Sequence, residues 1–223
     1  MPDFSVNKML QIRRLFVLKY YINKKLFMKE NWNSKYNNQE YLYGLEPNAF
    51  FKEFIGKETR ASILLPAEGE GRNAVFAAKN GFDVTAFDYS ETGRLKALKF
   101  AEEKGVSIKY NLVDINEYSS TDKFDYIGLF YAHFPLVMKN SFFAKLADQL
   151  ETKGKIVLEV FSTKQIQYSS GGPKDETMLF TKEEISSYFK SLKTILLEEK
   201  EINLSEGPGH TGKACVIRYI GQK

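Results

Sequence analysis

The stretch Ala67-Glu68-Gly69-Glu70-Gly71-Arg72-Asn73 (residues 67–73) decides how this sequence is interpreted. It follows an apolar run, residues 61–65, that is typical of a buried strand, and it leads directly into a helical pattern over residues 72–80. Glycines at such a junction let the backbone turn tightly and approach a ligand closely. An ordinary strand-to-helix turn also contains Gly-x-Gly, so the meaning of this stretch depends on the rest of the chain.

Strand and helix patterns alternate on both sides of this junction. A short helix is predicted over residues 47–56, with Pro47 at its favoured first position. The other predicted elements are strands at 61–65, 84–87, 106–113, 124–131 and 155–161, and helices at 72–80, 90–104 and 135–150. This alternation predicts a doubly wound α/β fold, in which helices cover both faces of a mostly parallel sheet.

The C-terminal part of the chain departs from the alternation. After a predicted helix at 181–189, two strand patterns cover residues 195–204 and 214–220. The nine residues between them are too few for the crossover helix that a parallel pair requires. The two strands are therefore predicted to pair antiparallel, as a C-terminal hairpin.

Length and composition exclude several classes of protein. A chain of 223 residues fits one domain. Cys215 is its only cysteine, which excludes an internal disulfide and a zinc site with several cysteine ligands. The two histidines, His133 and His210, are too few for a histidine-rich metal site, so no metal is expected. Cys215 lies within a predicted strand, as an inert buried thiol would.

The net charge of +4 is unevenly distributed. Residues 1–30 hold seven lysines and arginines against two acidic residues, a net charge of +5, so the remaining residues carry −1. A body this close to neutral is a poor nucleic-acid binder, because neutralising phosphates dominates that affinity. We therefore expect a small-molecule partner and no nucleic acid, while the oligomeric state stays open.

Residues 1–30 are interpreted as a basic helical extension, and residues 31–223 as the domain proper. The extension is too charged to span a membrane and lacks the features of a signal peptide, so no stable membrane insertion and a cytoplasmic location are expected. It fits a helix packed on the domain, an amphipathic helix on an anionic membrane, or a stretch upstream of a translation start at Met28. Residues 31–48, rich in Asn, Tyr and Trp, are interpreted as irregular and as either a lid or a cover on the core.

Two aspartates follow the next two strands. Asp88 ends the strand after the glycine-containing turn, where an acidic residue can accept both ribose hydroxyls of an adenosine-type cofactor. Asp114 follows the third strand, where its carboxylate can accept a hydrogen bond from an adenine amino group beside an apolar wall at Ile115. Each aspartate alone also suits a solvated loop or a helix cap. Together with the glycine turn, they predict a cofactor site at one edge of the sheet.

The turn itself favours one class of cofactor. A dinucleotide site uses Gly-x-Gly-x-x-Gly, whereas here Asn73 and Ala74 follow the two glycines. Glu68 and Glu70 would repel a pyrophosphate but attract the sulfonium and amino groups of S-adenosylmethionine. S-adenosylmethionine is therefore favoured over NAD.

At this point the sequence resembles a known family, the class I S-adenosylmethionine-dependent methyltransferases, and within it the tellurite-resistance-type branch that acts on small molecules. The resemblance covers about residues 31–223 and is carried by residues 32–36, 41–48, 67–75, 88–90, 131–135, 171–175 and 209–212. It implies a Rossmann-like, seven-stranded sheet that ends in an antiparallel hairpin, and methyl transfer to a small acceptor. Leu65 and Ala67 stand where the family pattern has an acidic residue and a first glycine, so a cofactor-binding protein without turnover is the alternative.

The resemblance and the motifs together predict three groups of site residues. The cofactor group is Ala67, Glu68, Gly69, Glu70, Gly71, Asn73, Asp88, Tyr89, Asp114 and Ile115. Trp32, Tyr36 and Tyr131 are candidates for an aromatic substrate wall, and each also suits core packing. His133 and His210 are candidates for proton transfer to or from the acceptor, and they equally suit the start of a helix and a solvated hairpin turn. The glycine-containing loop at 165–180 is interpreted as a lid on the substrate pocket.

Overall fold

The computed structural model describes residues 28–223, and its centre is one sheet of seven strands in the order β3-β2-β1-β4-β5-β7-β6. The strands are β1 (Ser62–Pro66), β2 (Asp83–Asp88), β3 (Lys109–Leu112), β4 (Phe124–Phe130), β5 (Leu150–Phe161), β6 (Lys193–Glu206) and β7 (His210–Gln222). β1 to β5 run parallel, whereas β7 pairs antiparallel with both β5 and β6. The expected doubly wound, mostly parallel sheet with a C-terminal hairpin is confirmed.

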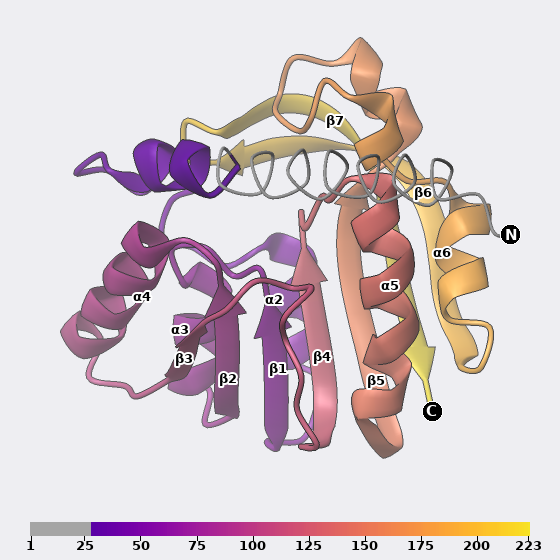
Figure 1. Cartoon of the computed structure of the whole chain (residues 1–223), viewed down its shortest axis with the longest axis horizontal. Coiled ribbons are helices and arrows are strands. Elements are labelled where there is room, and N and C mark those ends of the chain that lie inside the picture. Colours follow the sequence, from indigo (N-terminus) through magenta and orange to yellow (C-terminus); the bar gives the residue numbers. More distant parts are fainter. Residues whose placement is uncertain (1–27) are drawn as a thin grey trace, which may run out of the picture.

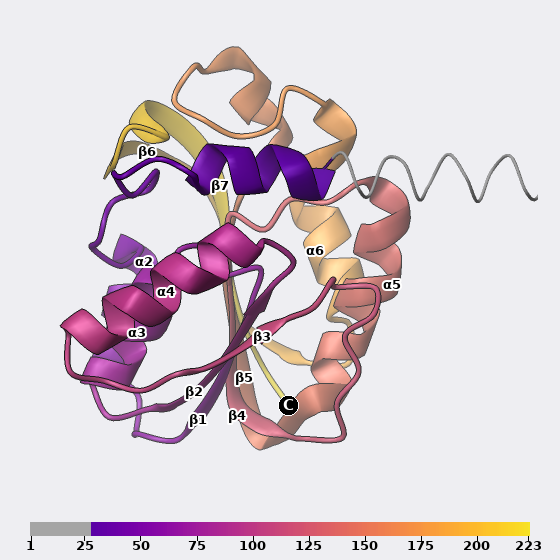
Figure 2. The ribbon, with the colours of Figure 1, turned by 60° about the vertical axis from the view of Figure 1, so that its left-hand side comes forward.

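Helices cover both faces of this sheet (Figure 2). One face carries α2 (Ala49–Ile55), α3 (Arg72–Lys79) and α4 (Glu91–Glu103), whose apolar side chains form one core cluster with the sheet. The other face carries α5 (Leu136–Leu146) and α6 (Lys182–Tyr188), which contribute to a second cluster. Ile63, Leu64 and Leu65 of β1 are fully buried between the two layers, as a central strand of such a sheet must be.

Short 3-10 helices complete the chain: η1 (Ala147–Gln149), η2 (Thr163–Gln167) and η3 (Glu176–Met178). The helix predicted over 135–150 therefore ends four residues early, and its last turn is η1 followed by the start of β5. The predicted strands at 155–161, 195–204 and 214–220 are all longer in the structure. Pairing between neighbouring strands, which a local pattern does not reveal, extends them at their polar ends.

The N-terminal part differs most from expectation. The chain is helical through residues 28–36, here called the N-terminal helix, where an irregular segment was predicted from residue 31. The predicted basic extension over residues 1–30 lies almost wholly outside the described residues. Within the described part of the chain, no helix combines the length and apolar character that crossing a bilayer requires.

Three segments gather above the carboxyl ends of the parallel strands (Figure 1). They are the N-terminal helix, the loop that follows β5, and the tip of the β6–β7 hairpin. In the hairpin, Glu206 pairs with His210 across a three-residue turn, Gly207–Pro208–Gly209. In open α/β sheets, ligands bind at this edge, where the carboxyl ends of the parallel strands meet.

Candidate functional site

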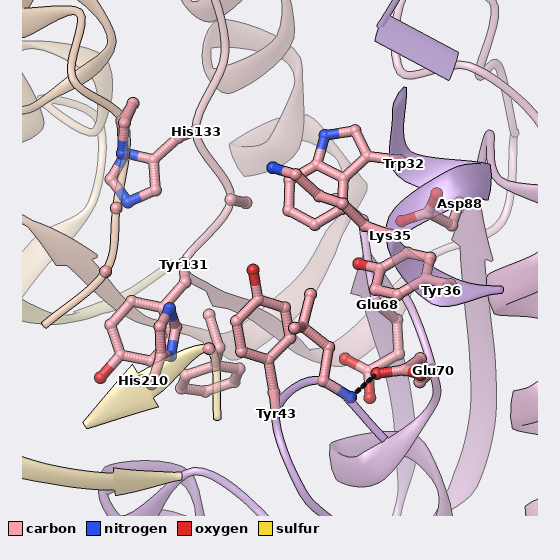
Figure 3. A pocket seen from close by; sticks show the side chains of 18 of the residues that line it. Trp32, Lys35, Tyr36, Tyr43, Glu68, Glu70, Asp88, Tyr131, His133 and His210 are labelled. Atoms are coloured by element: carbon pink, nitrogen blue, oxygen red, sulfur yellow. Dashed lines mark hydrogen bonds between the residues drawn. The ribbon is translucent and has the colours of Figure 1, made fainter. Parts of the chain in front are cut away.

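A pocket of about 590 Å³ lies at this edge, within the range of small-molecule sites. Its walls come from the N-terminal helix, residues 42–44, the glycine-containing loop, the ends of β2 and β4, the loop after β5 and the hairpin turn. Figure 3 shows two ends, with Asp88, Tyr36, Glu68 and Glu70 on one side and Tyr131, His133 and His210 on the other. Tyr43 lies between the two groups.

In the loop after β1, every second residue from Ala67 to Gly71 has a left-handed backbone conformation. Their φ angles are 52° at Ala67, 60° at Gly69 and 85° at Gly71. Gly71 also has no room for a side chain, because a Cβ there would lie 2.5 Å from the Cβ of Ala97. The two glycines are thus required by the turn and by the contact between α3 and α4, whereas Ala67 adopts a conformation that costs an L-residue energy.

Glu68 caps α3 instead of lying free in the loop. Its Oε1 accepts hydrogen bonds of 2.8 Å from the backbone N–H groups of both Asn73 and Ala74. Burial raises the pKa of Glu68 to about 7, although these hydrogen bonds act against the shift. Glu68 lines the pocket, so its charge near neutral pH depends on what lies beside it.

Glu70 connects the glycine-containing loop to α4 and to the segment around Leu42. Its Oε1 lies 2.5 Å from Nζ of Lys96, and its Oε2 accepts a hydrogen bond of 2.8 Å from the backbone N–H of Leu42. Lys96 also donates to the carbonyl oxygens of Tyr36 and Glu40, and so holds the end of the N-terminal helix against α4. Glu70 already has a cationic partner in Lys96, whereas the hydrogen bonds to Glu68 come from neutral N–H groups of Asn73 and Ala74. The expectation that the loop glutamates favour a cationic cofactor therefore rests on Glu68.

Asp88 lies at the end of β2, lines the pocket and is 7% exposed. Its Oδ2 accepts from the backbone N–H of Gly69 at 3.1 Å, and its Oδ1 accepts from that of Ser90 at 2.8 Å. Burial raises the pKa of Asp88 to about 6, against these hydrogen bonds. Each oxygen keeps a further lone pair that can accept from a ribose hydroxyl. Tyr89 lines the pocket next to it.

Asp114 and Ile115 do not line this pocket. The Asp114 side chain is buried and its Oδ1 accepts from the backbone and side-chain N–H groups of Asn116. Ile115 is 5% exposed, packs in the core cluster beneath α5, and borders a separate hollow beside the 116–120 loop. The structure thus brings Asp114 near Asp88 but places neither Asp114 nor Ile115 on the pocket wall.

The two aromatic candidates of the N-terminal helix have their rings in tilted contact. Trp32 and Tyr36 have ring centroids 5.3 Å apart, and both line the pocket. A Cβ on Gly69 would lie only 2.6 Å from the Tyr36 hydroxyl oxygen, and the Tyr36 ring packs on Gly93. Tyr36 therefore belongs to the end of the pocket that carries Asp88, not to the end that carries the histidines, and Trp32 covers it.

Tyr131 lies at the other end and has a φ of 55° directly after β4. Its hydroxyl donates to Glu159 Oε1 at 2.7 Å, and this carboxylate also accepts from Asn48 and from Arg218. Burial, with Glu159 nearby, raises the pKa of Tyr131 well above its ordinary value, so the hydroxyl stays a donor. The buried network fixes the Tyr131 side chain, whose ring contacts that of Phe161 at a centroid distance of 4.7 Å.

His133 has both ring nitrogens occupied. Nδ1 lies 2.9 Å from the carbonyl oxygen of Met178, to which it donates, and Nε2 accepts from the backbone N–H of Phe161 at 3.2 Å. Burial lowers the pKa of His133 to about 4. The prediction that His133 exchanges a proton with the acceptor finds no free nitrogen here. Instead, the ring joins the end of β5 to η3.

His210 is the histidine with a nitrogen open to the pocket. Its Nδ1 lies 3.3 Å from Glu206 Oε2, and no partner of Nε2 is found in the described part of the chain. The rings of Tyr43, Tyr131 and Phe161 surround it at centroid distances of 4.3, 4.4 and 5.3 Å. The alternative of a solvated hairpin turn does not hold, since His210 is only 3% exposed.

The end of the pocket that carries the histidines includes residues that the sequence did not indicate. Arg72 pairs with Glu206 at 2.8 Å, and Asn48 donates to both Glu159 and Glu206. Glu159 interrupts an apolar run in β5, and that interruption was a signal that the residue is not core. Arg72 and Asn48 lie in the stretches quoted above, but nothing local indicated their partners.

The loop after β5 covers this end, in the position predicted for a lid. It is not structureless, because η2 and η3 lie within it. Gly171 and Gly172 pack directly on His210 and Phe161, where a Cβ at either position would lie 2.7 Å from a ring carbon. Lys139 of α5, itself 1% exposed, anchors the far side of the loop through the carbonyl oxygen of Leu179. Among the described residues, no group of histidine, cysteine and acidic side chains has the arrangement of a metal site.

Comparison with known proteins finds one matching protein family and many similar structures. Residues 63–154 match a family described as a methyltransferase domain. TehB from Haemophilus influenzae has a similar structure, with a TM-score of 0.67 and 18% identity over 87% of this chain; the chain spans 66% of TehB, just under two thirds. A search of curated protein sequences finds no match to this chain.

Two other similar structures are covered almost completely by this chain. Magnesium protoporphyrin IX methyltransferase from Synechocystis, solved with S-adenosylmethionine, has a TM-score of 0.66 and 13% identity over 89% of this chain and 96% of its own. The N-methyltransferase NodS from Bradyrhizobium japonicum, solved with S-adenosylhomocysteine, has a TM-score of 0.64 and 12% identity over 87% and 97%. At these identities the likeness establishes the fold.

Proposed function

We propose that this chain is a class I S-adenosylmethionine-dependent methyltransferase that transfers the methyl group to a small-molecule acceptor bound beside His210, in keeping with its match to a methyltransferase domain and with its fold. One observation carries the proposal: a single pocket joins Asp88, at the end of β2, to an aromatic end around His210. A transferase needs donor and acceptor in one enclosed space, with the reacting atoms in contact. The volume of about 590 Å³ limits the acceptor to a small molecule.

The residues at the Asp88 end suit S-adenosylmethionine. Asp88 has acceptor capacity for ribose hydroxyls, and the left-handed glycines bring the backbone of the loop to the pocket. Glu68 lines the same wall with a carboxyl group that a neighbouring cation would ionise. The bound cofactor supplies an electrophilic methyl group and its own leaving group. Gly69, Gly71, Ala67, Glu70 and Asn73 shape this end, and Tyr89 extends it.

The protein's own residues then have to orient the acceptor and keep water away. The walls at the acceptor end are the rings of Tyr43, Tyr131 and Phe161, which surround His210. The loop that holds Gly171 and Gly172 covers them. Such walls desolvate a nucleophile, and desolvation with alignment is the largest help that a methyl transfer needs.

Of the two candidate histidines, we assign assistance to His210 and a positioning role to His133. His210 presents an unbonded Nε2 toward the pocket, whereas both nitrogens of His133 are hydrogen-bonded to backbone groups. Tyr131 contributes to the substrate wall, and Trp32 and Tyr36 lie nearer the cofactor end. The proposal further includes a cytoplasmic enzyme that does not act on nucleic acid, in keeping with a body whose net charge is −1.

Calorimetric titration with S-adenosylhomocysteine, with NAD as the parallel control, tests the cofactor site. We expect micromolar binding of the first and none of the second. Incubation with methyl-labelled S-adenosylmethionine and a panel of small phenols, thiols, amines and carboxylates then tests transfer. Binding without transfer to any of them would support the alternative, a cofactor-binding protein without turnover, and NAD binding would contradict the assignment of the cofactor end.

A further inference from the structure

We propose that Glu206 and His210 act together as the base that takes the proton from an acceptor hydroxyl group, so that the acceptor is a hydroxylated aromatic compound. The inference rests on the proposed function and goes beyond it by naming the substrate class. It depends on the geometry of His210, on the groups around it, and on the shape of the acceptor end.

The hydrogen bonding of His210 defines which nitrogen can act. Nδ1 donates to Glu206 Oε2 at 3.3 Å, which leaves the lone pair on Nε2. Nε2 has no hydrogen-bond partner among the described residues. It is not fully buried either, so it remains accessible from the pocket. The Cδ2–Nε2 edge of the ring faces Gly171, where a Cβ would lie 3.3 Å from Nε2. A side chain at residue 171 would crowd this edge, so the glycine keeps Nε2 from being covered by the loop.

The carboxylate behind the histidine is itself fixed. Glu206 Oε2 pairs with Arg72 at 2.8 Å, and its Oε1 accepts from Asn48 at 3.3 Å. Burial works to raise the pKa of Glu206, but His210 and Arg72 together outweigh it and lower the pKa. Glu206 is therefore ionised at neutral pH and stabilises the imidazolium that forms when Nε2 accepts a proton.

The charged and titratable groups around His210 come from several elements. Glu206 and Glu159 raise its pKa, Arg72 of α3 lowers it, and burial lowers it most, so the pKa lies below its ordinary value. The hydroxyl groups of Tyr43 and Tyr131 stay protonated, because burial raises the pKa of both. His210 is thus neutral at the start of the reaction, which is the state that a base requires.

A base at this point selects the class of nucleophile. An aromatic hydroxyl has a pKa near that of tyrosine, about 10, so near neutral pH it needs a base as it attacks. An aromatic thiol is largely ionised already, and a neutral amine attacks through its free lone pair, so neither depends on a base in the same way. The rings of Tyr43, Tyr131 and Phe161 favour a flat apolar body for the molecule that carries the hydroxyl.

The acceptor hydroxyl attacks the methyl carbon in one displacement. A lone pair of the hydroxyl oxygen forms the new O–C bond to the methyl carbon. The S–C bond breaks, and its electron pair stays on sulfur as a neutral thioether. The hydroxyl proton moves to Nε2 of His210, and the resulting imidazolium, paired with Glu206, later releases it to solvent. No other reactant is needed.

The first test uses a matched pair of acceptors, phenol and thiophenol, with labelled S-adenosylmethionine. In His210→Gln we expect phenol methylation to fall by on the order of 10²–10³, while thiophenol methylation stays within about threefold of wild type. Glu206→Gln should show the same selectivity, and it guards against a folding defect specific to one variant. His133→Gln is the control, and it should affect both acceptors alike because that ring only positions the loop.

Equal loss of both acceptors in His210→Gln, in a variant that still binds S-adenosylhomocysteine, would overturn the inference but leave the proposed function standing. The same holds if wild type methylates thiophenol and not phenol. If wild type binds S-adenosylhomocysteine but methylates neither phenol nor thiophenol, the inference fails. The small-molecule proposal fails only if the amines and carboxylates of the panel are not methylated either.

A second test does not depend on turnover. The chain has only two histidines, so a nitrogen-labelled imidazole spectrum of wild type contains two rings, and His133→Gln assigns them. At pH 7 with S-adenosylhomocysteine bound, we expect His210 to be neutral with its proton on Nδ1. In Glu206→Gln the proton should redistribute between the nitrogens. A His210 that is protonated on both nitrogens, or on Nε2 alone, at pH 7 would overturn the inference.

Discussion

Arg72 and Glu206 form an ion pair of 2.8 Å between two segments that are 134 residues apart in sequence. Arg72 is the first residue of α3 and directly follows the last glycine of the cofactor loop. Glu206 is the last residue of β6 and contacts His210. Both side chains are largely buried, at 9% and 13% exposure. The pair therefore joins the glycine-containing loop at one end of the pocket to the histidine at the other end.

Loss of Arg72 should cost stability. Arg72→Gln leaves Glu206 buried without its cationic partner, and breaking one side of such a pair costs about 3–5 kcal/mol. Urea unfolding measures the effect, and Lys79→Gln, at the exposed end of the same helix, is the matched control. A change no larger than that of the control would show that the pair does not contribute to stability.

Replacing Ala67 with glycine should increase the stability of the folded protein. Its φ of 52° is a conformation that costs an L-residue on the order of 1–2 kcal/mol. Ala67→Gly removes this cost but adds freedom to the unfolded chain, so we expect a net stabilisation of roughly 0.5–1 kcal/mol. Thermal unfolding checks this, and a lower melting temperature in Ala67→Gly would contradict it.

Gly71 should not tolerate even one added carbon. Gly71→Ala places a Cβ 2.5 Å from that of Ala97 in a residue with a φ of 85°, so α3 and α4 must separate. We expect a loss on the order of 2 kcal/mol or more, together with weaker binding of S-adenosylhomocysteine. Gly105→Ala, where φ is also positive but no atom lies within 4 Å, separates the conformational cost from the clash.

The stability of the ligand-free protein should fall as the pH rises from about 5 to 8. Burial raises the pKa of Glu68 to about 7, so the folded state holds this proton more tightly than the unfolded state does. Stability from this source is present below the unfolded pKa and is lost as the pH rises through the folded pKa. Glu68→Gln should remove roughly 1–3 kcal/mol of that decline, measured by unfolding at several pH values. An unchanged decline would place its origin elsewhere.

Asp88 should matter for cofactor affinity far more than an acidic residue at the other end of the same strand. Asp88→Asn weakens hydrogen bonds to a carboxylate, which contribute about 1.5–3 kcal/mol, so S-adenosylhomocysteine binding should weaken about 10- to 100-fold. Asp83→Asn, exposed at the start of β2, should bind as wild type does. Calorimetry compares the two, and equal affinities would remove Asp88 from the cofactor site.

Much of the fold could be predicted from local patterns. The alternation of apolar runs with helical periods indicated the parallel part of the sheet, and the short connection between the last strands indicated their antiparallel pairing. Asp88 and the glycine loop could be placed because the carboxyl ends of parallel strands meet at one edge. These features depend on neighbours in sequence or on a general rule of the fold.

The chemistry at the acceptor end depends on partners that are distant in sequence. Asn48 and Glu159 are 111 residues apart, and no local pattern relates them. His133 seemed equivalent to His210 in sequence, yet backbone groups of Met178 and Phe161 occupy both its nitrogens. The N-terminal helix could not be predicted for a related reason. Contacts with distant residues, such as that of Asn33 with Ser90 at the N-cap of α4, stabilise it, and its sequence has no clear apolar period.

The three-residue turn of the hairpin limits how this pocket can change. A Cβ on Gly207 would lie 2.5 Å from the backbone nitrogen of Gly44, and Gly209 donates its N–H to the carbonyl oxygen of Leu42. The turn is thus pressed against the segment that also bonds Glu70, and one inserted residue would lift His210 away from the cofactor end. In a relative that binds a larger molecule, the additional space would have to come from a change in the loop around Gly171 and Gly172. The position of the histidine relative to the sheet would stay the same.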